Sequence, residues 1–331
     1  MRFRFAARLV VTVIVVLALG DVLLWRAFPR LSRLSDNFSA AYLSRQVDAL
    51  RATEPVVVLG DSVLWGFGIA ANETAIARLA SRGRPYENFA YEGGSPANTY
   101  AMVRVLLREH VRPRSVIFNV NLESFGPADS AYRRLHPAVE RLASPLLSAR
   151  ERALLEPGTA PSLDARLAGL VESVWHAYAM RSDIRAVLFG APDAAHAIQN
   201  AVERASGTTA RRARAHRPSA DRFEGTYDLS PLAPANVSIA FLERTARALR
   251  DAQIPAYAFL TPTNHALLRA FIDVPEYRAQ LAYVRRLLML GGVHVLDYDA
   301  AFPANEFIDN DHLTPAGNAH LATLLARDVP F

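Results

Sequence analysis

The stretch Val56-Val57-Val58-Leu59-Gly60-Asp61-Ser62 constrains the fold of this chain more than any other. Four apolar residues, three of them β-branched, predict a short strand that is buried on both faces. Gly60 permits a sharp turn after the strand, and ligands of open α/β sheets bind at the carboxyl ends of the strands. Ser62 therefore occupies a position that suits a nucleophile and equally suits an ordinary helix N-cap.

Similar apolar runs recur along the chain, with helical patterns between them. They predict strands near 86–90, 115–121, 255–261 and 293–296, and helices over 72–81, 96–110, 237–253 and 275–290. Short connections between alternating strands and helices imply right-handed parallel crossovers. We therefore expect an α/β fold: a three-layer α/β/α sandwich with a mostly parallel sheet.

A second motif, Asp309-Asn310-Asp311-His312-Leu313-Thr314-Pro315, contains the base that a serine nucleophile requires. Thr314 is a good N-cap and Pro315 suits the first helical position, so His312 is expected on the loop before a helix. Asp309 can then accept a hydrogen bond from one imidazole nitrogen while the other nitrogen faces Ser62. This is the arrangement of a Ser-His-Asp triad, which is recognised by role and not by chain order.

Two alternatives at this motif remain open. Asp311 is the other carboxylate that can orient His312, and we prefer Asp309 because of its three-residue offset. The same three side chains could form part of a metal site, although zinc sites usually contain more histidines at helical spacing. The chain has no cysteine, which excludes thiol catalysis, disulfides and cysteine metal sites. We expect neither a metal nor another cofactor.

Four short blocks in a fixed order carry a family resemblance. Gly60-Asp61-Ser62-Val63 and Asp309-x-x-His312 resemble the first and last blocks of the SGNH (GDSL) hydrolase family. Asn88-Phe89-Ala90-Tyr91-Glu92-Gly93 is similar to its glycine block, and Ser115–Asn121 to its asparagine block. The resemblance implies an SGNH/flavodoxin-like fold and a catalytic triad of Ser62, His312 and Asp309.

The resemblance also implies an oxyanion hole made of the backbone amides of Ser62 and Gly93 and the side chain of Asn121. Gly93 is preferred to Gly94. In the third block Asn119 stands where glycine is usual, and Leu122 where aspartate is usual. Asn119 is thus the alternative donor, and Asn121 is preferred because it lies nearer the strand end.

The N-terminus has the features of an export signal. Three arginines precede an apolar run over residues 9–24 that is interrupted at Gly20-Asp21. Positive charges before such a run keep the N-terminus in the cytoplasm and direct the rest across the membrane. A cleaved signal peptide and a signal anchor both fit, and we favour the anchor because no small-x-small cleavage pattern directly follows Leu24. The expected location is the inner membrane, single-pass, with the catalytic domain extracytoplasmic, or periplasmic in a Gram-negative cell.

These features divide the chain into four parts. Residues 1–27 are the anchor, 28–54 a polar amphipathic stalk, 55–125 with 236–331 the hydrolase domain, and 126–235 a mainly helical insertion. A helix over 194–205 and a mobile basic loop at 211–217 are expected within the insertion. At the carboxyl edge of the sheet the insertion would act as a lid or partner surface, or serve only as structural padding.

Three further residues are weak candidates for substrate contacts. Trp65 follows the nucleophile, and Asn264 and His265 follow the fourth expected strand. The plain alternatives are core packing for Trp65 and a turn with a local hydrogen bond for the other two.

The expected chemistry is attack of Ser62 on an ester carbonyl, followed by transfer of the acyl group to water or to a sugar hydroxyl. A membrane anchor before such a domain is similar to the extracytoplasmic subunits of polysaccharide O-acyltransferase systems. We therefore expect an esterase acting on O-acyl groups, above all O-acetyl groups, of cell-envelope glycans. The alternatives are an O-acyltransferase with a membrane-bound O-acyltransferase partner and a catalytically silent glycan-binding or scaffold subunit.

The charge of the chain fits this setting. The formal net charge is +5 and its basic residues are all arginine. Mild positive charge suits an anionic membrane surface or an acidic polymer. No nucleic-acid-binding motif is present in the sequence, so nucleic acid is not an expected partner.

Overall fold

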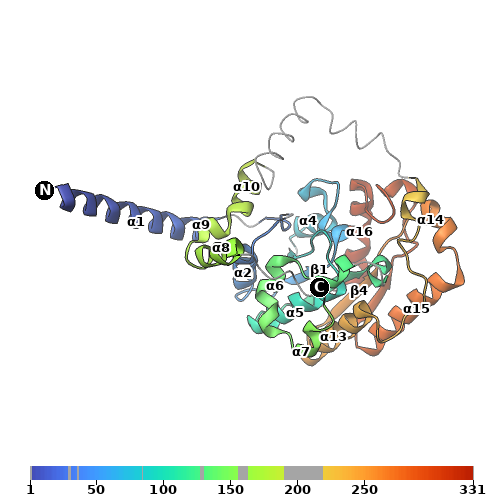
Figure 1. The fold of residues 1–331 in the computed structure, drawn as a ribbon. Coiled ribbons are helices and arrows are strands. Elements are labelled where there is room, and N and C mark those ends of the chain that lie inside the picture. Colours follow the sequence, from blue (N-terminus) through green and yellow to red (C-terminus); the bar gives the residue numbers. More distant parts are fainter. Residues whose placement is uncertain are drawn as a thin grey trace.

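The computed structural model describes residues 2–28, 31–35, 37–83, 85–126, 130–155, 163–189 and 219–330. The fold is α/β, with a five-stranded, all-parallel sheet in the order β2-β1-β3-β4-β5 (Figure 1). The strands are β1 (Val56–Leu59), β2 (Tyr86–Asn88), β3 (Ser115–Val120), β4 (Ala256–Leu260) and β5 (His294–Asp297). The predicted parallel sheet is confirmed.

Helices make up much of the rest of the described chain. They are α1 (Arg2–Ala27), α2 (Ala40–Ala49), α3 (Ser62–Trp65), α4 (Ala75–Ala80), α5 (Pro96–Arg108), α6 (Pro137–Ala143), α7 (Ala149–Arg152), α8 (Leu163–Val174), α9 (His176–Ala179), α10 (Arg181–Phe189), α13 (Val237–Asp251), α14 (His265–Ile272), α15 (Pro275–Leu290) and α16 (Pro315–Asp328). Polar residues begin the helices that follow the strands: Ser95 caps α5, Asn236 caps α13 and Thr314 caps α16. The predicted N-cap at Thr314 is confirmed, as is the helix predicted near 237–253.

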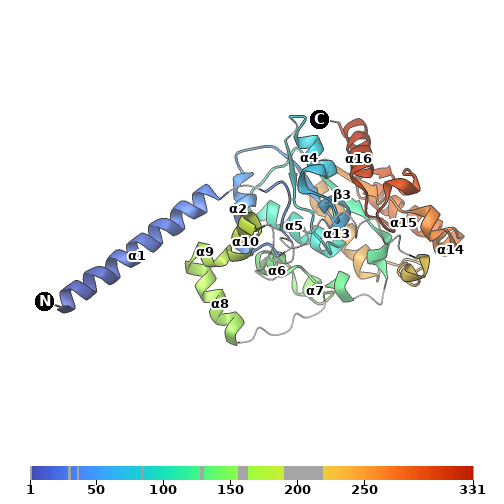
Figure 2. The ribbon, with the colours of Figure 1, turned by 90° about the horizontal axis from the view of Figure 1, so that it is seen from above.

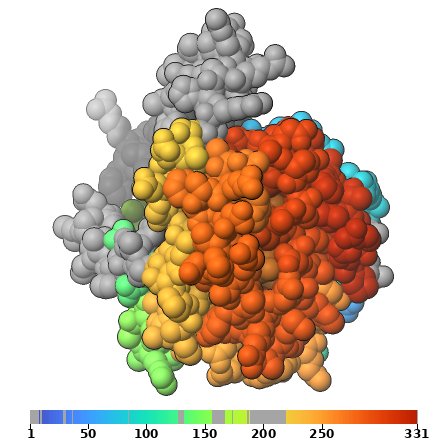
Figure 3. All heavy atoms as spheres, turned by 90° about the vertical axis from the view of Figure 1, so that its right-hand side faces the viewer, coloured from blue at the N-terminus to red at the C-terminus, as the bar shows by residue number. Residues whose placement is uncertain are grey.

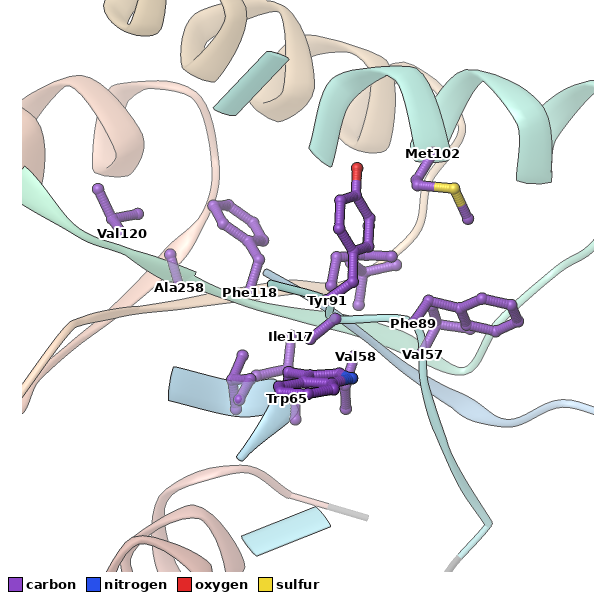
Figure 4. Close-up of a cluster of buried hydrophobic side chains, with 14 of the residues drawn as sticks. Val57, Val58, Trp65, Phe89, Tyr91, Met102, Ile117, Phe118, Val120 and Ala258 are labelled. Carbon is purple, nitrogen blue, oxygen red and sulfur yellow. The ribbon is translucent and has the colours of Figure 1, made fainter. Parts of the chain in front are cut away.

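The core lies on both sides of the sheet. Every residue of β1, β3 and β4 is buried, which explains why these strands read as apolar runs without alternation. Figure 4 shows Phe118 and Met102 on one side of the strands and Trp65 on the other. Helices α5 and α13 pack together, as do α4 and α16. This arrangement is consistent with the expected sandwich. Figure 3 shows the face that the chain after residue 219 presents.

The segment 28–54 is not the polar stalk that we predicted. Helix α2 places Tyr42, Leu43 and Val47 in the hydrophobic core, and Phe38 before it is buried as well. The amphipathic pattern marked the buried face of a helix that packs on the domain. A free linker has no apolar stripe to bury, so this pattern favoured docking.

Helix α1 extends away from the rest of the described chain (Figures 1 and 2). Its exposed large apolar side chains are Val11, Val13, Ile14, Val15, Val16, Leu17, Leu19, Val22 and Leu23. Within the described residues, the length and hydropathy needed to cross a membrane are not found together in any helix, and the predicted N-terminal membrane helix is not found there.

The described part of residues 126–235 contains helices and 3₁₀ turns and no strand. Helix α6 packs against α2 and α5, and α9 packs against α1 and α2. The 3₁₀ turn η5 (Ala220–Phe223) leads back toward the sheet. The predicted helix over 194–205 and the predicted basic loop at 211–217 lie outside the described residues.

Candidate active site

The candidate nucleophile, Ser62, is the first residue of α3, directly behind the end of β1. The Asp61 carboxylate caps this short helix by accepting a hydrogen bond from the Val63 amide at 2.9 Å. Gly60 has φ +150°, and a Cβ there would lie 2.0 Å from Asn119 Oδ1. Only glycine fits this turn, because a side chain would collide with the end of β3.

The candidate base, His312, lies on the loop before α16 as predicted. Its Nε2 is 2.8 Å from Ser62 Oγ, and its Nδ1 is 2.8 Å from Asp309 Oδ2. The loop is fixed because the Ile308 amide donates to the His312 carbonyl at 2.7 Å. The predicted meeting of hydroxyl, imidazole and carboxylate is confirmed. Their catalytic roles remain a prediction.

Asp309 contacts His312 more closely than Asp311 does. Both oxygens of Asp309 lie within 2.9 Å of Nδ1, whereas the nearest Asp311 oxygen is 3.2 Å away. Burial disfavours the charged form of Asp309, but hydrogen bonds from the imidazole and from the His312 and Asp311 amides outweigh it and lower its pKa. Asp309 therefore stays ionised and fits the orienting role better.

Two backbone amides are suited to an oxyanion hole. The Ser62 and Gly93 residues both line the pocket, and among the described residues neither amide has a hydrogen-bond acceptor. The Gly94 amide, in contrast, donates to the Tyr91 carbonyl at 3.1 Å. Gly94 has another role, because a Cβ there would lie 2.1 Å from the Gly60 carbonyl oxygen. The geometry thus favours Gly93 as the donor. Gly94 instead allows the close packing of the two backbone segments.

The two asparagines of β3 and its end have different surroundings. Asn119 is buried, accepts from the Asp61 amide at 3.2 Å and donates to Thr261 Oγ1 at 3.0 Å. Asn121 lines the pocket, but its amide nitrogen donates to Asp311 Oδ2 at 2.7 Å. Asn121 thus lies where an oxyanion donor is needed, with one of its two N–H groups engaged by a carboxylate.

Three further carboxyls lie close to the triad: Asp61 and Asp311 are buried, and Glu123 is half-buried. Burial raises the pKa of Asp61, and it raises the pKa of Asp311 to about 7. Burial, with the nearby Asp311 and Asp61, raises the pKa of Glu123 to about 9. Acids this close together cannot all ionise, because each added negative charge repels the others. At least one of the three carboxyls, above all Glu123, therefore holds a proton at neutral pH.

The same charges act on the base. Burial disfavours the imidazolium, but the Asp309 hydrogen bond and the charges of Asp311, Asp309 and Asp61 outweigh it. The pKa of His312 is raised to about 9. At neutral pH the imidazole consequently carries a proton in the free protein.

A cavity of about 610 Å³ opens in front of Ser62. The sequence did not single out the residues that form its outer wall. They are Phe67, whose ring centroid lies 4.5 Å from that of His312, Glu123, and Tyr132, Arg222, Phe223 and Thr226 from the insertion. Glu123 had a local signal, an acidic residue just behind a strand end. The insertion residues had none, because only tertiary packing brings them to the pocket.

The three weak substrate candidates lie outside this cavity. Trp65 is buried, and its indole donates to the Leu34 carbonyl at 2.7 Å. Asn264 caps α14 and donates to the Asp309 carbonyl at 2.9 Å. His265 pairs with Asp299 at 2.8 Å. Asn264 therefore supports the loop of the triad, and Trp65 belongs to the core.

Asp309, Asp311 and His312 also meet the distance requirement for a metal site. Their ligand atoms lie within 4.8 Å of one another. His312 Nδ1 faces both carboxylates, while Nε2 faces Ser62. A cation would replace the Nδ1 proton, so the metal site and the triad exclude each other at this nitrogen.

The raised pKa of His312 predicts the pH dependence of Ser62 reactivity. A general base must be neutral, so the rate of Ser62 acylation should rise about tenfold per pH unit below the pKa and level off near pH 9. Initial rates of labelling by a serine-directed phosphonate measure this directly. A profile that levels off below pH 7 would contradict the raised pKa.

Glu123→Gln is expected to stabilise the protein in neutral solution. The pKa of Glu123 rises from 4.5 to about 9 on folding. Because the unfolded chain releases this proton first, the free energy of unfolding decreases as the pH increases through that window. Glutamine keeps the oxygen that accepts from Asn310 and removes the titration. We expect a gain of about 1–3 kcal/mol in the free energy of unfolding at pH 7 and no gain at pH 4. Denaturant titrations at the two pH values provide the measurement, and an equal effect at both would disprove the pKa assignment.

In comparisons with known proteins, no protein-family model matches this chain, and no curated protein matches it.

Proposed function

We propose that this protein is a serine ester hydrolase of the SGNH type. The observation that carries the proposal is the continuous hydrogen-bond chain from Asp309 through His312 to Ser62, which ends in an open cavity. A serine that merely caps a helix requires neither a histidine on its hydroxyl nor a carboxylate behind that histidine. The four blocks in family order support the same reading.

The proposed reaction follows from these positions. His312 Nε2 takes the Ser62 proton, and Oγ attacks the ester carbonyl while the Ser62 and Gly93 amides hold the oxyanion. The imidazolium then protonates the departing alcohol as its C–O bond breaks. Water, deprotonated by the same nitrogen, attacks the acyl carbonyl, and the imidazolium returns that proton to Ser62 Oγ as the C–Oγ bond breaks and the acid leaves.

The proposed substrates are O-acyl groups, above all O-acetyl groups, of cell-envelope glycans outside the cytoplasm. Support comes from the resemblance to extracytoplasmic subunits of polysaccharide O-acyltransferase systems. The exposed apolar side chains of α1 support attachment to the membrane through this helix. A cavity of about 610 Å³ suits an acylated sugar unit.

Transfer of the acyl group to a sugar hydroxyl is the second candidate. It is favoured by the wall that Phe223 and Thr226 of the insertion add in front of the nucleophile. An acceptor sugar bound against this wall would displace water from the acyl-enzyme and compete with it. In that case a membrane-bound O-acyltransferase would be the partner that supplies acyl groups.

The nucleophile is tested by labelling with a fluorescent phosphonate in the presence and absence of EDTA. We expect one label per chain, unaffected by EDTA and absent from Ser62→Ala. Ser39→Ala is the matched control, because Ser39 also lies at the start of a helix, where it accepts from the Tyr42 amide and contacts Asp183 and, among the described residues, no histidine. Labelling that persists in Ser62→Ala, or that EDTA abolishes, would reject the proposed mechanism.

Esterase and transferase are separated with an acyl ester donor, with and without a glycan acceptor. Release of free acid at the same rate, with no acylated glycan, identifies the esterase. Acceptor-dependent donor consumption with acylated glycan as product identifies the transferase.

A further inference from the structure

Helix α8 exposes an apolar face that no other described segment covers. Leu167, Leu170, Val171 and Val174 follow the spacing of one helix face, and they are 52%, 66%, 38% and 79% exposed. Trp175, which follows the helix, is 42% exposed. Contiguous exposed apolar patches on a folded protein usually mark an interaction surface.

Aromatic and basic side chains border this face. The Trp175 ring stacks on Tyr178 with centroids 5.9 Å apart, and the Arg181 guanidinium lies 4.2 Å from the Tyr178 ring centre. Trp25 of α1 lies against His176, at 4.4 Å between centroids. Tryptophan and tyrosine concentrate where a bilayer meets water, because their rings combine an apolar body with a polar group.

Asp21 fixes this group to α1. Its carboxylate accepts hydrogen bonds from the backbone amides of His176 and Ala177, at 3.2 and 2.6 Å, and its Oδ2 is 2.8 Å from His176 Nδ1. Asp21 is only 9% exposed. The single acidic residue of α1 thus joins this helix to α9. Trp175 and α8 directly precede α9 in the chain.

The directions of the helices suit a bilayer surface. Figures 1 and 2 show α8 running across the axis of α1, beside the end of α1 that meets the domain. On a membrane to which α1 attaches the protein, as proposed above, α8 would lie along the surface. Arg26 at the end of α1 and Arg185 on α10 are both exposed, and such cations favour anionic headgroups.

We propose that the apolar face of α8, together with Trp175, is a membrane-binding surface that lies in the headgroup region of an anionic bilayer. This inference rests on the proposed attachment through α1 and adds a second contact, which holds the domain at a fixed orientation. An amphipathic helix of this kind places its apolar face about 5–10 Å into the boundary between headgroups and acyl chains.

The absence of cysteine makes a direct test possible, since one introduced thiol is unique in the chain. Val174→Cys in the full chain is labelled with an environment-sensitive fluorophore and added to phosphatidylcholine–phosphatidylglycerol vesicles. Met289→Cys, on α15 and 61% exposed, is the matched control. Leu170→Cys repeats the test at a second position of the face. Phosphonate labelling of Ser62 in the same samples reports on the active site.

We expect the label at 174 to shift to shorter wavelength and to lose about half of its fluorescence when the lipids carry a headgroup-proximal nitroxide, because the face lies in that region. The label at 289 should show neither the wavelength shift nor the loss of fluorescence. Equal responses at 174 and 289 in vesicle-bound protein would overturn the inference and leave the attachment through α1 intact. If the protein does not sediment with vesicles, both the inference about α8 and the proposed attachment through α1 are overturned. A shift at 174 that depends on protein concentration and ignores the nitroxide identifies a second copy of the chain as the occupant and also overturns the inference.

Discussion

His312→Ala is expected to lower the rate of ester hydrolysis by about 10⁴–10⁶ without unfolding the protein. The imidazole Nε2 lies 2.8 Å from Ser62 Oγ, and no other described side chain is hydrogen-bonded to that hydroxyl. Without it, the serine proton has no acceptor and the hydroxyl is a weak nucleophile. Turnover of a chromogenic acetyl ester measures the loss, and circular dichroism checks the fold.

His265→Ala is the control for the loss of a histidine–carboxylate pair. His265 contacts Asp299 at 2.8 Å, as His312 contacts Asp309, but it lies outside the cavity. We expect this variant to stay within about threefold of the unchanged rate, because His265 lines no part of the cavity and its loss removes no contact with the reacting groups. If both alanine variants lose the same activity, the loss reflects stability and His312 is not the base.

Asp309→Asn is expected to reduce hydrolysis by about 10⁴, and Asp311→Asn by far less. Asparagine at 309 cannot accept the Nδ1 proton with both oxygens, so the wrong imidazole tautomer faces Ser62. Asp311 lies 3.2 Å from Nδ1 and chiefly holds the Asn121 amide. The same ester assay on both variants ranks the two carboxylates.

The pH profile distinguishes a structural from an electrostatic role of Asp311. Its charge is among those that raise the pKa of His312, so Asp311→Asn should shift the rise of activity to lower pH. Asp309→Asn should lose activity at every pH. If instead Asp311→Asn is the inactive variant, the orienting carboxylate is Asp311 and the three-residue offset misled us.

Much of the fold could be predicted because its signals are local. Strands buried on both faces, such as β1 and β4, must be apolar throughout, and the sequence displays this directly. Helix starts at Asn236 and Thr314 depend on a side chain and an amide three residues apart. The loop position of His312 follows from the same local chemistry.

The rest depends on contacts between distant parts of the chain. The Asn121 amide meets a carboxylate 190 residues later, and no local pattern reveals that Asp311 would occupy it. We interpreted Asp21 as an interruption of an apolar run, but it pairs with the backbone amides of His176 and Ala177, which also lie far along the chain. The burial of α2 was missed because the apolar face formed by residues such as Tyr42 and Val47 does not reveal which part of the protein it packs against.

The separation of Ser62 from His312 by 250 residues also has a consequence for biosynthesis. A ribosome that has completed β1 must still translate everything up to the histidine before the hydroxyl can lose its proton. Under the proposed mechanism the nascent polypeptide is inert toward esters until then, and a transcript truncated before codon 309 yields only inactive product. For an exported hydrolase, such late assembly would spare esters in the compartment where the chain is made.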